Sequence, residues 1–440
     1  MDLNSLVDDD SSGGIFRVHR SVFTSPQIAE LEQRNIFNRC WIYLGHESEI
    51  PNSGDFRRRT VAGKPLFWVR GSDGQVRVFH NSCTHWGANV CRFDEGNAEV
   101  FQCFYHAWTF NNRGNLVSVP DEAAYGAGFR KEAMGLVSPA RIDHYRGFYF
   151  VSFNPDIEGL QTYLTGAKNY VDLILDQSEA GWRVAPGTQK YAVRANWKMF
   201  SLNSLDNYHV QPLHATFFKY TESLGSGDPP AAPPGSFPGR NGRALSLGAG
   251  HGVDIFPSMT RARPIAHWHP ILGEDSKEEV RNMRDHLVRE FGEERAYMMC
   301  DTNRLMLIYP NFALHDIAAV SLRYFEPVGP EYMEVTVQTL VPCGESSGLL
   351  NRRLENFLSF LGPGGFAHPD DIEAMESAQT GFRAGGPEWI DASRGMNRNA
   401  HAVDELHVRA FWRQWHANIL GHAKADRHHD LPNGRKDKSV

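Results

Sequence analysis

Two short cysteine–histidine pairs constrain the fold of this chain more than any other feature. The pairs are Cys83-Thr84-His85 and Cys103-Phe104-Tyr105-His106, with 17 residues between them. Each pair lies beside a predicted turn, so two β loops can bring both pairs to one site. Two thiolates and two imidazoles suit either a tetrahedral zinc ion or a 2Fe-2S cluster in which two cysteines hold one iron and two histidines hold the other. The sequence therefore predicts two loops that converge on a metal centre.

The alternating order of the four ligands favours the 2Fe-2S cluster. A zinc finger usually runs Cys, Cys, His, His, whereas here each pair can supply one ligand to each iron. Because neutral imidazoles leave less negative charge on the cluster than four thiolates would, its reduction potential rises, to about −150 to +300 mV for this class. The pairs predict a Rieske-type cluster that relays electrons, with a zinc site as the alternative.

Length and composition are those of a globular protein with substantial cores. The 440 residues, 41% of them hydrophobic, are enough for two or three domains. A net charge of −7 argues against a nucleic acid as partner. Six cysteines are too few for a disulfide scaffold in a chain of this length, which leaves free thiols or metal ligands. Long apolar runs are missing and the first residues are acidic, so we expect a cytoplasmic protein with no membrane partner.

The spacing of apolar and turn residues predicts an α+β chain with four divisions. Residues 40–155 contain short β-rich runs separated by glycine and aspartate turns, which predicts a small antiparallel β domain. Residues 1–39 are expected to form an N-terminal helical segment that packs on a catalytic domain. That domain is expected to span residues 156–425, and residues 426–440 are expected to form a flexible tail.

Several elements are predicted within these divisions. Ser25 and Pro26 are expected to cap and begin a helix over residues 25–39. Residues 225–239 are too rich in proline and glycine for regular structure. Further helices are expected after Asn196 and over residues 277–299, 350–361 and 405–420, and strands over residues 304–314, 318–328 and 332–342.

A second set of metal-binding side chains is formed by Asp206, His209 and His214. On a helix, Asp206 and His209 lie one turn apart on the same face, so the carboxylate can hold the imidazole N–H. His209 and His214 would point about 140° apart on an undisturbed helix. Pro212 is placed to distort or end the helix between them, which would let both histidines reach one metal ion.

This second set, preceded by Asn196-Trp197-Lys198, resembles the catalytic motif of Rieske non-haem iron ring-hydroxylating oxygenases, large (alpha) subunit. The resemblance extends over nearly the whole chain. It implies a Rieske 2Fe-2S domain of antiparallel strands, and a catalytic domain whose antiparallel sheet is flanked by helices in the helix-grip, START-like manner. The motif residues, in order, are Asn203, Asp206, Tyr208, His209 and His214. The implied cluster ligands are Cys83, His85, Cys103 and His106.

The resemblance also implies a mononuclear iron(II) site. Its ligands would be His209, His214 and a carboxylate from late in the chain, and three ligands on one face of the metal leave open positions for dioxygen. Asp371, in the stretch GPGGFAHPDDIEAMES, is the best match for this carboxylate, and Asp370 is the alternative. The residues expected in catalysis or in the substrate pocket are Asn203, Phe200 and Phe366.

The implied activity is that of the terminal oxygenase component of a multicomponent dioxygenase. It would use O2 and electrons from NAD(P)H to cis-dihydroxylate an aromatic ring, with a benzoate-like acid such as salicylate or p-cumate as the expected kind of substrate. Monohydroxylation, as in a salicylate hydroxylase, or demethylation would use the same ligands. A protein that carries only the cluster is a third alternative, but it leaves the second motif unexplained.

The resemblance implies several protein partners. The chain has no nicotinamide or flavin motif, so a separate reductase, a ferredoxin or both are expected to deliver electrons. A small (beta) subunit and a trimer of large subunits, α3 or α3β3, are expected as well. In that trimer Asp206 would bridge His209 to His106, or else to His85, of a neighbouring copy. The chain departs from the usual pattern at Leu202, where the family commonly has Glu, and at Trp86, where it commonly has Arg.

Overall fold

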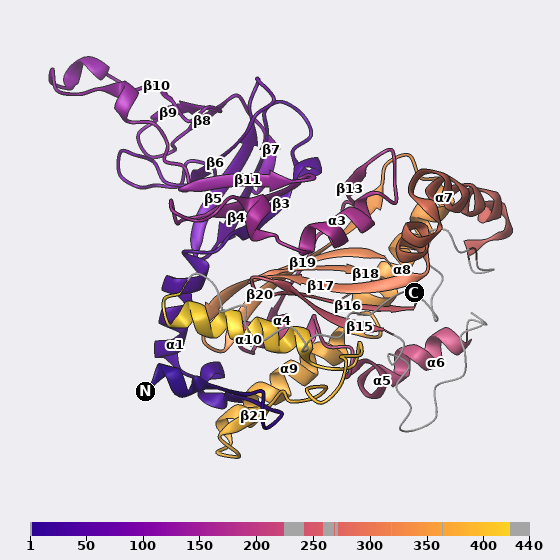
Figure 1. Cartoon of the computed structure of the whole chain (residues 1–440). Coiled ribbons are helices and arrows are strands. Elements are labelled where there is room, and N and C mark those ends of the chain that lie inside the picture. Colours follow the sequence, from indigo (N-terminus) through magenta and orange to yellow (C-terminus); the bar gives the residue numbers. More distant parts are fainter. Residues whose placement is uncertain are drawn as a thin grey trace. The chain divides into compact units, whose positions relative to one another are not determined.

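The chain forms two compact units, Phe37–Leu160 and a second unit that combines Met1–Ile36 with Gln161–Val440 (Figure 1). The first unit is therefore an insertion in the sequence of the second. The predicted proline/glycine loop at 225–239 and tail at 426–440 lie outside the described residues. This computed structural model describes residues 2–223, 242–257, 268, 272–317, 319–362 and 364–422.

The inserted unit, Phe37–Leu160, consists of antiparallel strands, as the hairpin spacing predicts. Its three sheets have the strand orders β6-β5-β4-β7, β10-β9-β8 and β11-β12-β3. The apolar core contains the rings of Phe67, Phe79 and Phe101, with Phe67 in contact with both of the others. The strands are β3 Ile42–His46, β4 Asp55–Val61, β5 Lys64–Arg70, β6 Val76–His80, β7 Glu95–Asn97, β8 Val100–Gln102, β9 Thr109–Asn111, β10 Leu116–Ser118, β11 Arg141–Tyr145 and β12 Phe148–Ser152. The short 3-10 helices are Glu47–Glu49, Glu122–Ala124 and Lys131–Ala133.

The second unit is organised around one antiparallel sheet of eight strands. Its order is β13-β20-β19-β18-β17-β16-β15, and β14 also pairs with β20. The predicted strand at 304–314 is in fact a hairpin, because Pro310 and Asn311 are turn residues between β17 and β18. The strands are β13 Trp182–Val184, β14 Gln189–Val193, β15 Arg243–Gly248, β16 His251–Pro257, β17 Thr302–Ile308, β18 Phe312–Asp316, β19 Val320–Gly329 and β20 Tyr332–Pro342.

Helices cover this sheet, which confirms the predicted α+β class. The amphipathic helix α10 lies along β15 and β16 (Figure 1), α8 packs on β20 and α9 packs on β14. The predicted helix at 277–299 is present as α7, but Gly292 at φ 80° interrupts it. The helices are α2 Leu160–Tyr163, α3 Ala167–Leu175, α4 Trp197–Asn203, α5 Val210–Leu213, α6 Ala215–Ser223, α7 Lys277–Cys300, α8 Ser347–Leu361, α9 His368–Arg383 and α10 Leu406–Ile419, with a 3-10 turn at Glu274–Ser276. None of the helices within the described ranges has the length and apolar character needed to cross a membrane.

The N-terminal segment contains strands as well as the predicted helix. Ser25 caps α1 by accepting a hydrogen bond from the N–H of Ile28, as predicted, and a π-helical turn continues α1. Two strands of this segment that the sequence did not suggest join β21 in a three-stranded sheet of the order β1-β2-β21. The elements are a 3-10 turn at Leu3–Leu6, β1 Val7–Asp10, β2 Ile15–His19, a 3-10 turn at Arg20–Phe23, α1 Pro26–Glu32, the π-helical turn Gln33–Phe37 and β21 Trp389–Asp391.

A buried carboxylate, Glu32, joins this segment to the rest of its unit. It accepts hydrogen bonds from the indole N–H of Trp197 and of Trp415, both at 2.7 Å, and pairs with the ammonium of Lys198. Asn196 caps α4 by accepting the N–H of Lys198. The Asn-Trp-Lys sequence thus begins a helix and holds Glu32, so its contacts are structural.

Candidate metal centres

Both cysteine–histidine pairs lie in loops with the same backbone hydrogen bonds. The N–H of Cys83 donates to the carbonyl of Ala88, and the N–H of Cys103 donates to the carbonyl of Trp108, both at 2.8 Å. In each loop a second bond returns to the cysteine carbonyl, from Gly87 to Cys83 and from Ala107 to Cys103. Two loops of matching conformation therefore present one pair each.

The structure brings the four side chains of these pairs together. The His85 and His106 rings meet edge to face with their centroids 4.6 Å apart, and both cysteine side chains are buried. Burial and the neighbouring Cys103 thiol raise the pKa of Cys83, while the N–H groups of His85 and Trp86 act to lower that pKa. The buried Nδ1 of His85 has no hydrogen-bond partner among the described residues. Two cysteines and two histidines with an unpartnered imidazole nitrogen fit a 2Fe-2S cluster of mixed ligation.

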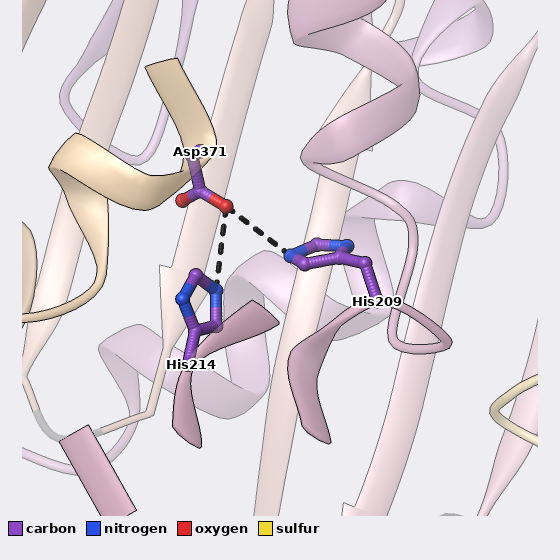
Figure 2. Close-up of side chains that lie close together, drawn as sticks. All are labelled: His209, His214 and Asp371. Atoms are coloured by element: carbon purple, nitrogen blue, oxygen red, sulfur yellow. Dashed lines mark ion pairs between the residues drawn. The ribbon is translucent and has the colours of Figure 1, made fainter. Parts of the chain in front are cut away.

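A second centre lies in the other unit, where His209, His214 and Asp371 point toward one another (Figure 2). The Oδ1 atom of Asp371 is 3.3 Å from Nε2 of each histidine. Ligand atoms at right angles and about 2.1 Å from an ion lie about 3 Å apart. The three side chains therefore have the spacing of ligands on one face of an octahedral ion, which is the arrangement of the 2-His-1-carboxylate triad.

The two histidines occupy the ends of a single short helix. His209 directly precedes α5 and His214 directly follows it, while Pro212 lies in its first turn, where a proline removes no helical hydrogen bond. The expected helix break between the histidines is thus wrong. The break comes earlier, because α4 ends at Asn203 and Asp206 lies in the following turn, where its side chain accepts the N–H of Tyr208 at 2.7 Å.

Acidic side chains hold the far nitrogen of each imidazole. Oδ2 of Asp206 lies 3.0 Å from Nδ1 of His209, in the turn rather than on the predicted helix. Oδ2 of Asp370 lies 3.4 Å from Nδ1 of His214. Carboxylates in these places fix the ring orientation and the tautomer of a metal-binding histidine. The structure therefore places Asp370 behind a histidine and places Asp371 between the two histidines.

Asn203 and the local charges complete the arrangement. The amide of Asn203 donates to Oδ1 of Asp371 at 3.1 Å. Burial acts to raise the pKa of Asp371, but hydrogen bonds from His209 and His214 hold it well below its usual range. Burial acts to lower the pKa of His209, but Asp206 and Asp371 together raise it to about 9. The carboxylates of Asp206 and Asp371 therefore favour positive charge beside them, either as a proton on His209 or as a metal cation bound between the histidines and Asp371.

The triad opens into a cavity whose floor is one face of the eight-stranded sheet. Leu305 on β17 pairs with His315 on β18, and Arg323 on β19 is two residues from the partner of His315, so all three point to the same face. Asn203, Asp206 and the triad line the cavity together with these strand residues. The remaining lining residues are Asn207, Tyr208, Val210, Gln211, Phe218, Phe256, Pro257, Asn303, Ile317, Phe360, Leu361 and Val403.

Two of the three predicted pocket residues do not line this cavity. Phe200 is fully buried, with its ring against that of Phe325 and next to the guanidinium of Arg323, and it does not reach the cavity. Phe366 stacks on Tyr220 at a centroid distance of 4.4 Å. His315 and Arg323, which no sequence motif indicates, line the cavity instead. The signal that could have revealed Arg323 is a charged residue between the run AAVSL and Tyr324-Phe325, because an arginine is rarely buried in a strand unless it has a partner.

Comparison with known proteins decides the family. Residues 40–138 match the family described as Rieske [2Fe-2S] domain, and residues 180–421 match the family described as ring hydroxylating alpha subunit (catalytic domain). The chain belongs to the ring-hydroxylating oxygenase alpha subunits. This alpha subunit thus has both a Rieske 2Fe-2S cluster and a mononuclear iron as cofactors, one in each unit.

Named relatives agree over nearly the whole length of this alpha subunit. It is 34% identical over 412 residues to toluate 1,2-dioxygenase subunit alpha of Pseudomonas putida, covering 92% of this chain and 87% of the relative. It is 30% identical to the 2-halobenzoate 1,2-dioxygenase large subunit of Burkholderia cepacia, covering 89% and 83%. Naphthalene 1,2-dioxygenase from Rhodococcus sp. superposes with a TM-score of 0.81 at 27% identity, covering 92% and 94%.

Proposed function

We propose that the chain is the large subunit of a terminal oxygenase that cis-dihydroxylates an aromatic acid. One observation carries this proposal. His209, His214 and Asp371 bring one ligand atom each close enough together to bind a single metal ion, and they do so in a largely apolar cavity. In the overall reaction, an aromatic acid, O2, NAD(P)H and H⁺ give a cis-dihydrodiol and NAD(P)⁺. The choice of an aromatic acid rests on the relatives named for toluate and 2-halobenzoate.

We assign the mononuclear iron to His209, His214 and Asp371. When bound there, iron would supply the activation of O2. Asp206 and Asp370 hold the imidazoles, and the amide of Asn203 holds the carboxylate of Asp371. Apolar side chains such as Leu305, Ile317 and Phe360 keep water from the bound ring.

We assign the cluster to Cys83, His85, Cys103 and His106, and we propose that it receives electrons from a ferredoxin or reductase. Asp206 then links His209 to a cluster histidine, His106 or His85, in a second copy of this chain. Two observations support this role. The Asp206 side chain is 33% exposed, so it can be reached from outside, and Trp86 beside the cluster is 68% exposed, as an interface residue would be in a single chain. We propose an α3 or α3β3 assembly as the setting of this link.

The fate of dioxygen tests the reaction. The purified oxygenase, supplied with a reductase and ferredoxin, is given 3-methylbenzoate and ¹⁸O2, and the product is analysed by mass spectrometry. The proposal expects a cis-diol with both oxygens labelled. A product with one labelled oxygen would show a monooxygenase, and an absence of oxidised acid together with oxidation of naphthalene or biphenyl would exclude the acid substrate.

A further inference from the structure

Asp254 on β16 is a fully buried carboxyl group behind the turn that contains Asp206. Neither of its oxygens has a hydrogen-bond partner among the residues that the structure describes. Its neighbours across the sheet, Ala244 on β15 and Leu305 on β17, are apolar. An ionised carboxylate in such a place is far more costly than the neutral acid, because neither water nor a cation compensates its charge. The surroundings of Asp254 therefore favour the protonated form.

The other buried carboxyl groups within the described ranges all have a basic partner. The pairs are Glu32 with Lys198, Glu49 with Arg59, Asp316 with Arg304, Asp371 with His209 and His214, and Asp404 with Arg398. The charges that face Asp254 are instead negative, from Asp206 in the turn after α4 and from Asp404 before α10. Burial and these two carboxylates raise the pKa of Asp254 well above its usual range. Asp254 thus holds its proton where the paired acids have lost theirs.

His407 on α10 lies between Asp254 and the turn that contains Asp206. Helix α10 packs closely on β16 here, since a Cβ added to Gly252 would lie 2.8 Å from Cβ of His407. Nε2 of His407 is 2.6 Å from the carbonyl oxygen of Leu205 and 3.6 Å from Oδ1 of Asp254. Burial lowers the pKa of His407 to about 4, so the ring is neutral. Its one N–H is at Nε2 and donates to Leu205, the residue directly before Asp206.

The protonation state of Asp254 decides which oxygen attracts this N–H. A neutral carboxyl group at 3.6 Å leaves the N–H of His407 to the carbonyl of Leu205. An ionised carboxylate is a stronger acceptor and would draw the imidazole away from the turn. It would also repel the carboxylate of Asp206, which holds Nδ1 of His209 at 3.0 Å. A charge on Asp254 would therefore disturb the contact between Asp206 and His209.

We propose that His407 is a positioning residue for Asp206, and that Asp254 makes this positioning depend on a proton. With the proton on Asp254, His407 anchors the turn and Asp206 is aligned with His209 for electron delivery. As the pH rises and the proton passes to solvent, the anchor weakens and electron delivery slows. This inference rests on the proposed function of Asp206 as the link to a cluster. Asp254 and His407 act through Asp206 and not on the substrate.

Single-turnover reoxidation of the cluster tests this inference. The intact, iron-loaded oxygenase is reduced without air and mixed with 3-methylbenzoate and O2, and the visible absorption of the cluster is followed from neutral to alkaline pH. In the wild type the reoxidation rate should fall as the pH rises. In Asp254→Asn, which cannot ionise, this fall should be absent. The matched control is Glu405→Gln, which removes a nearby acid whose pKa is raised by burial to about 7, and it should keep the fall.

Two variants of His407 test the anchor itself. His407→Leu removes the donor to Leu205, so reoxidation should slow roughly tenfold at every pH, as expected for the loss of one hydrogen bond. The cluster spectrum and the iron content should persist. His407→Gln can still donate to the same carbonyl and should recover most of the rate. Equal rates in the two variants would show that the hydrogen bond does not position Asp206.

An infrared difference spectrum between wild type and Asp254→Asn measures the proton directly. At neutral pH the wild type should show the carbonyl stretch of one protonated carboxylic acid that the variant lacks, and its presence in both proteins overturns the inference. A pH dependence of reoxidation that is absent in the wild type, equal in Asp254→Asn, or lost only in Glu405→Gln overturns it as well. Asp254→Leu, which is neutral and similar in volume, replaces the asparagine variant if that variant does not fold.

Failure of the proposed function gives a different result. Normal reoxidation in Asp206→Asn would refute the electron link itself. Slow reoxidation in Asp206→Asn, together with an unaltered pH dependence in Asp254→Asn, would keep the link and refute only the role of Asp254.

Discussion

Oδ2 of Asp206 lies 3.0 Å from Nδ1 of His209, while Nε2 of the same ring faces Asp371 at 3.3 Å. The two nitrogens of the His209 imidazole therefore have different partners. One nitrogen is available to iron, and the other is held by a carboxylate that is reachable from outside the subunit. Under the proposed function, Asp206 would therefore act on electron delivery through His209, without touching the metal.

Replacing Asp206 by asparagine tests electron delivery separately from metal binding. The amide oxygen can still accept the N–H of His209, but the charge is lost. We expect the Rieske spectrum and the iron content to persist and coupled turnover to fall roughly 10- to 100-fold. In a single-turnover experiment with substrate present, the reduced cluster should stay reduced. Normal reoxidation of the cluster would contradict the proposed link.

The adjacent aspartates Asp370 and Asp371 provide a matched pair. Asp371→Asn removes the charge that both histidines share, so metal analysis should show iron lost while the cluster spectrum remains. Asp370→Asn alters only a 3.4 Å contact from a side chain that is 36% exposed, so most iron should stay bound. The reverse pattern of iron loss would assign the ligand to Asp370.

Cys83 and Cys91 provide a similar control in the inserted unit. Cys83→Ser should abolish the visible absorption and the rhombic electron-resonance signal of the cluster. Cys91 is buried too, but its thiol donates to the carbonyl of Phe93 and burial raises its pKa to about 11, so it remains a neutral thiol. Cys91→Ser should keep the cluster, and cluster loss in this variant would refute the ligand assignment.

Removal of the charge on Glu32 should destabilise the second unit. Glu32→Gln leaves the ammonium of Lys198 buried without a counter-charge, which costs about 3–5 kcal/mol in comparable sites. The melting temperature should therefore fall. The double variant Glu32→Gln/Lys198→Met should recover part of the loss, and additive destabilisation by the two changes would contradict this account.

Stability should also fall in acid because of His251. This imidazole accepts the N–H of Tyr309 at Nδ1 and lies 2.8 Å from the carbonyl of Tyr163 at Nε2, and burial lowers its pKa from 6.5 to about 4. Above pH 6.5 it is neutral in both folded and unfolded chains. As the pH falls toward 4, the unfolded chain gains the proton first, so the folded state loses up to about 3 kcal/mol. In His251→Gln the free energy of unfolding should depend less on pH over this interval, and an equal slope would exclude this histidine as the cause.

Local sequence patterns predicted much of the architecture but little of its long-range pairing. The antiparallel domain and the caps of α1 and α4 follow from nearby residues. The pairing of β2 with β21 joins Arg17 to Asp391, and nothing in either segment specifies the other. The sequence predicts a single strand in place of the hairpin of β17 and β18, because both halves are apolar and only Tyr309, Pro310 and Asn311 separate them.

The site was predictable where a ligand type and a spacing coincide. The Cys-x-His, Cys-x-x-His and His209/His214 motifs meet this condition. The choice between Asp370 and Asp371 depends on which side of α9 faces inward, and residues one position apart cannot be distinguished by pattern. His315 and Arg323 come from different strands and approach one another only through the sheet register, so no short motif contains them.

The buried contacts of Glu32 with Trp197, Lys198 and Trp415 also have a consequence for biosynthesis. Its carboxylate leaves the ribosome before the whole inserted unit, yet one of its indole donors, on Trp415, follows 383 residues later. Until then the N-terminal segment has no complete set of partners, although the inserted unit can already be folded. We expect the cluster domain to mature during translation and the iron-binding unit to close only near its end, which would make the alpha subunit most dependent on chaperones late in synthesis.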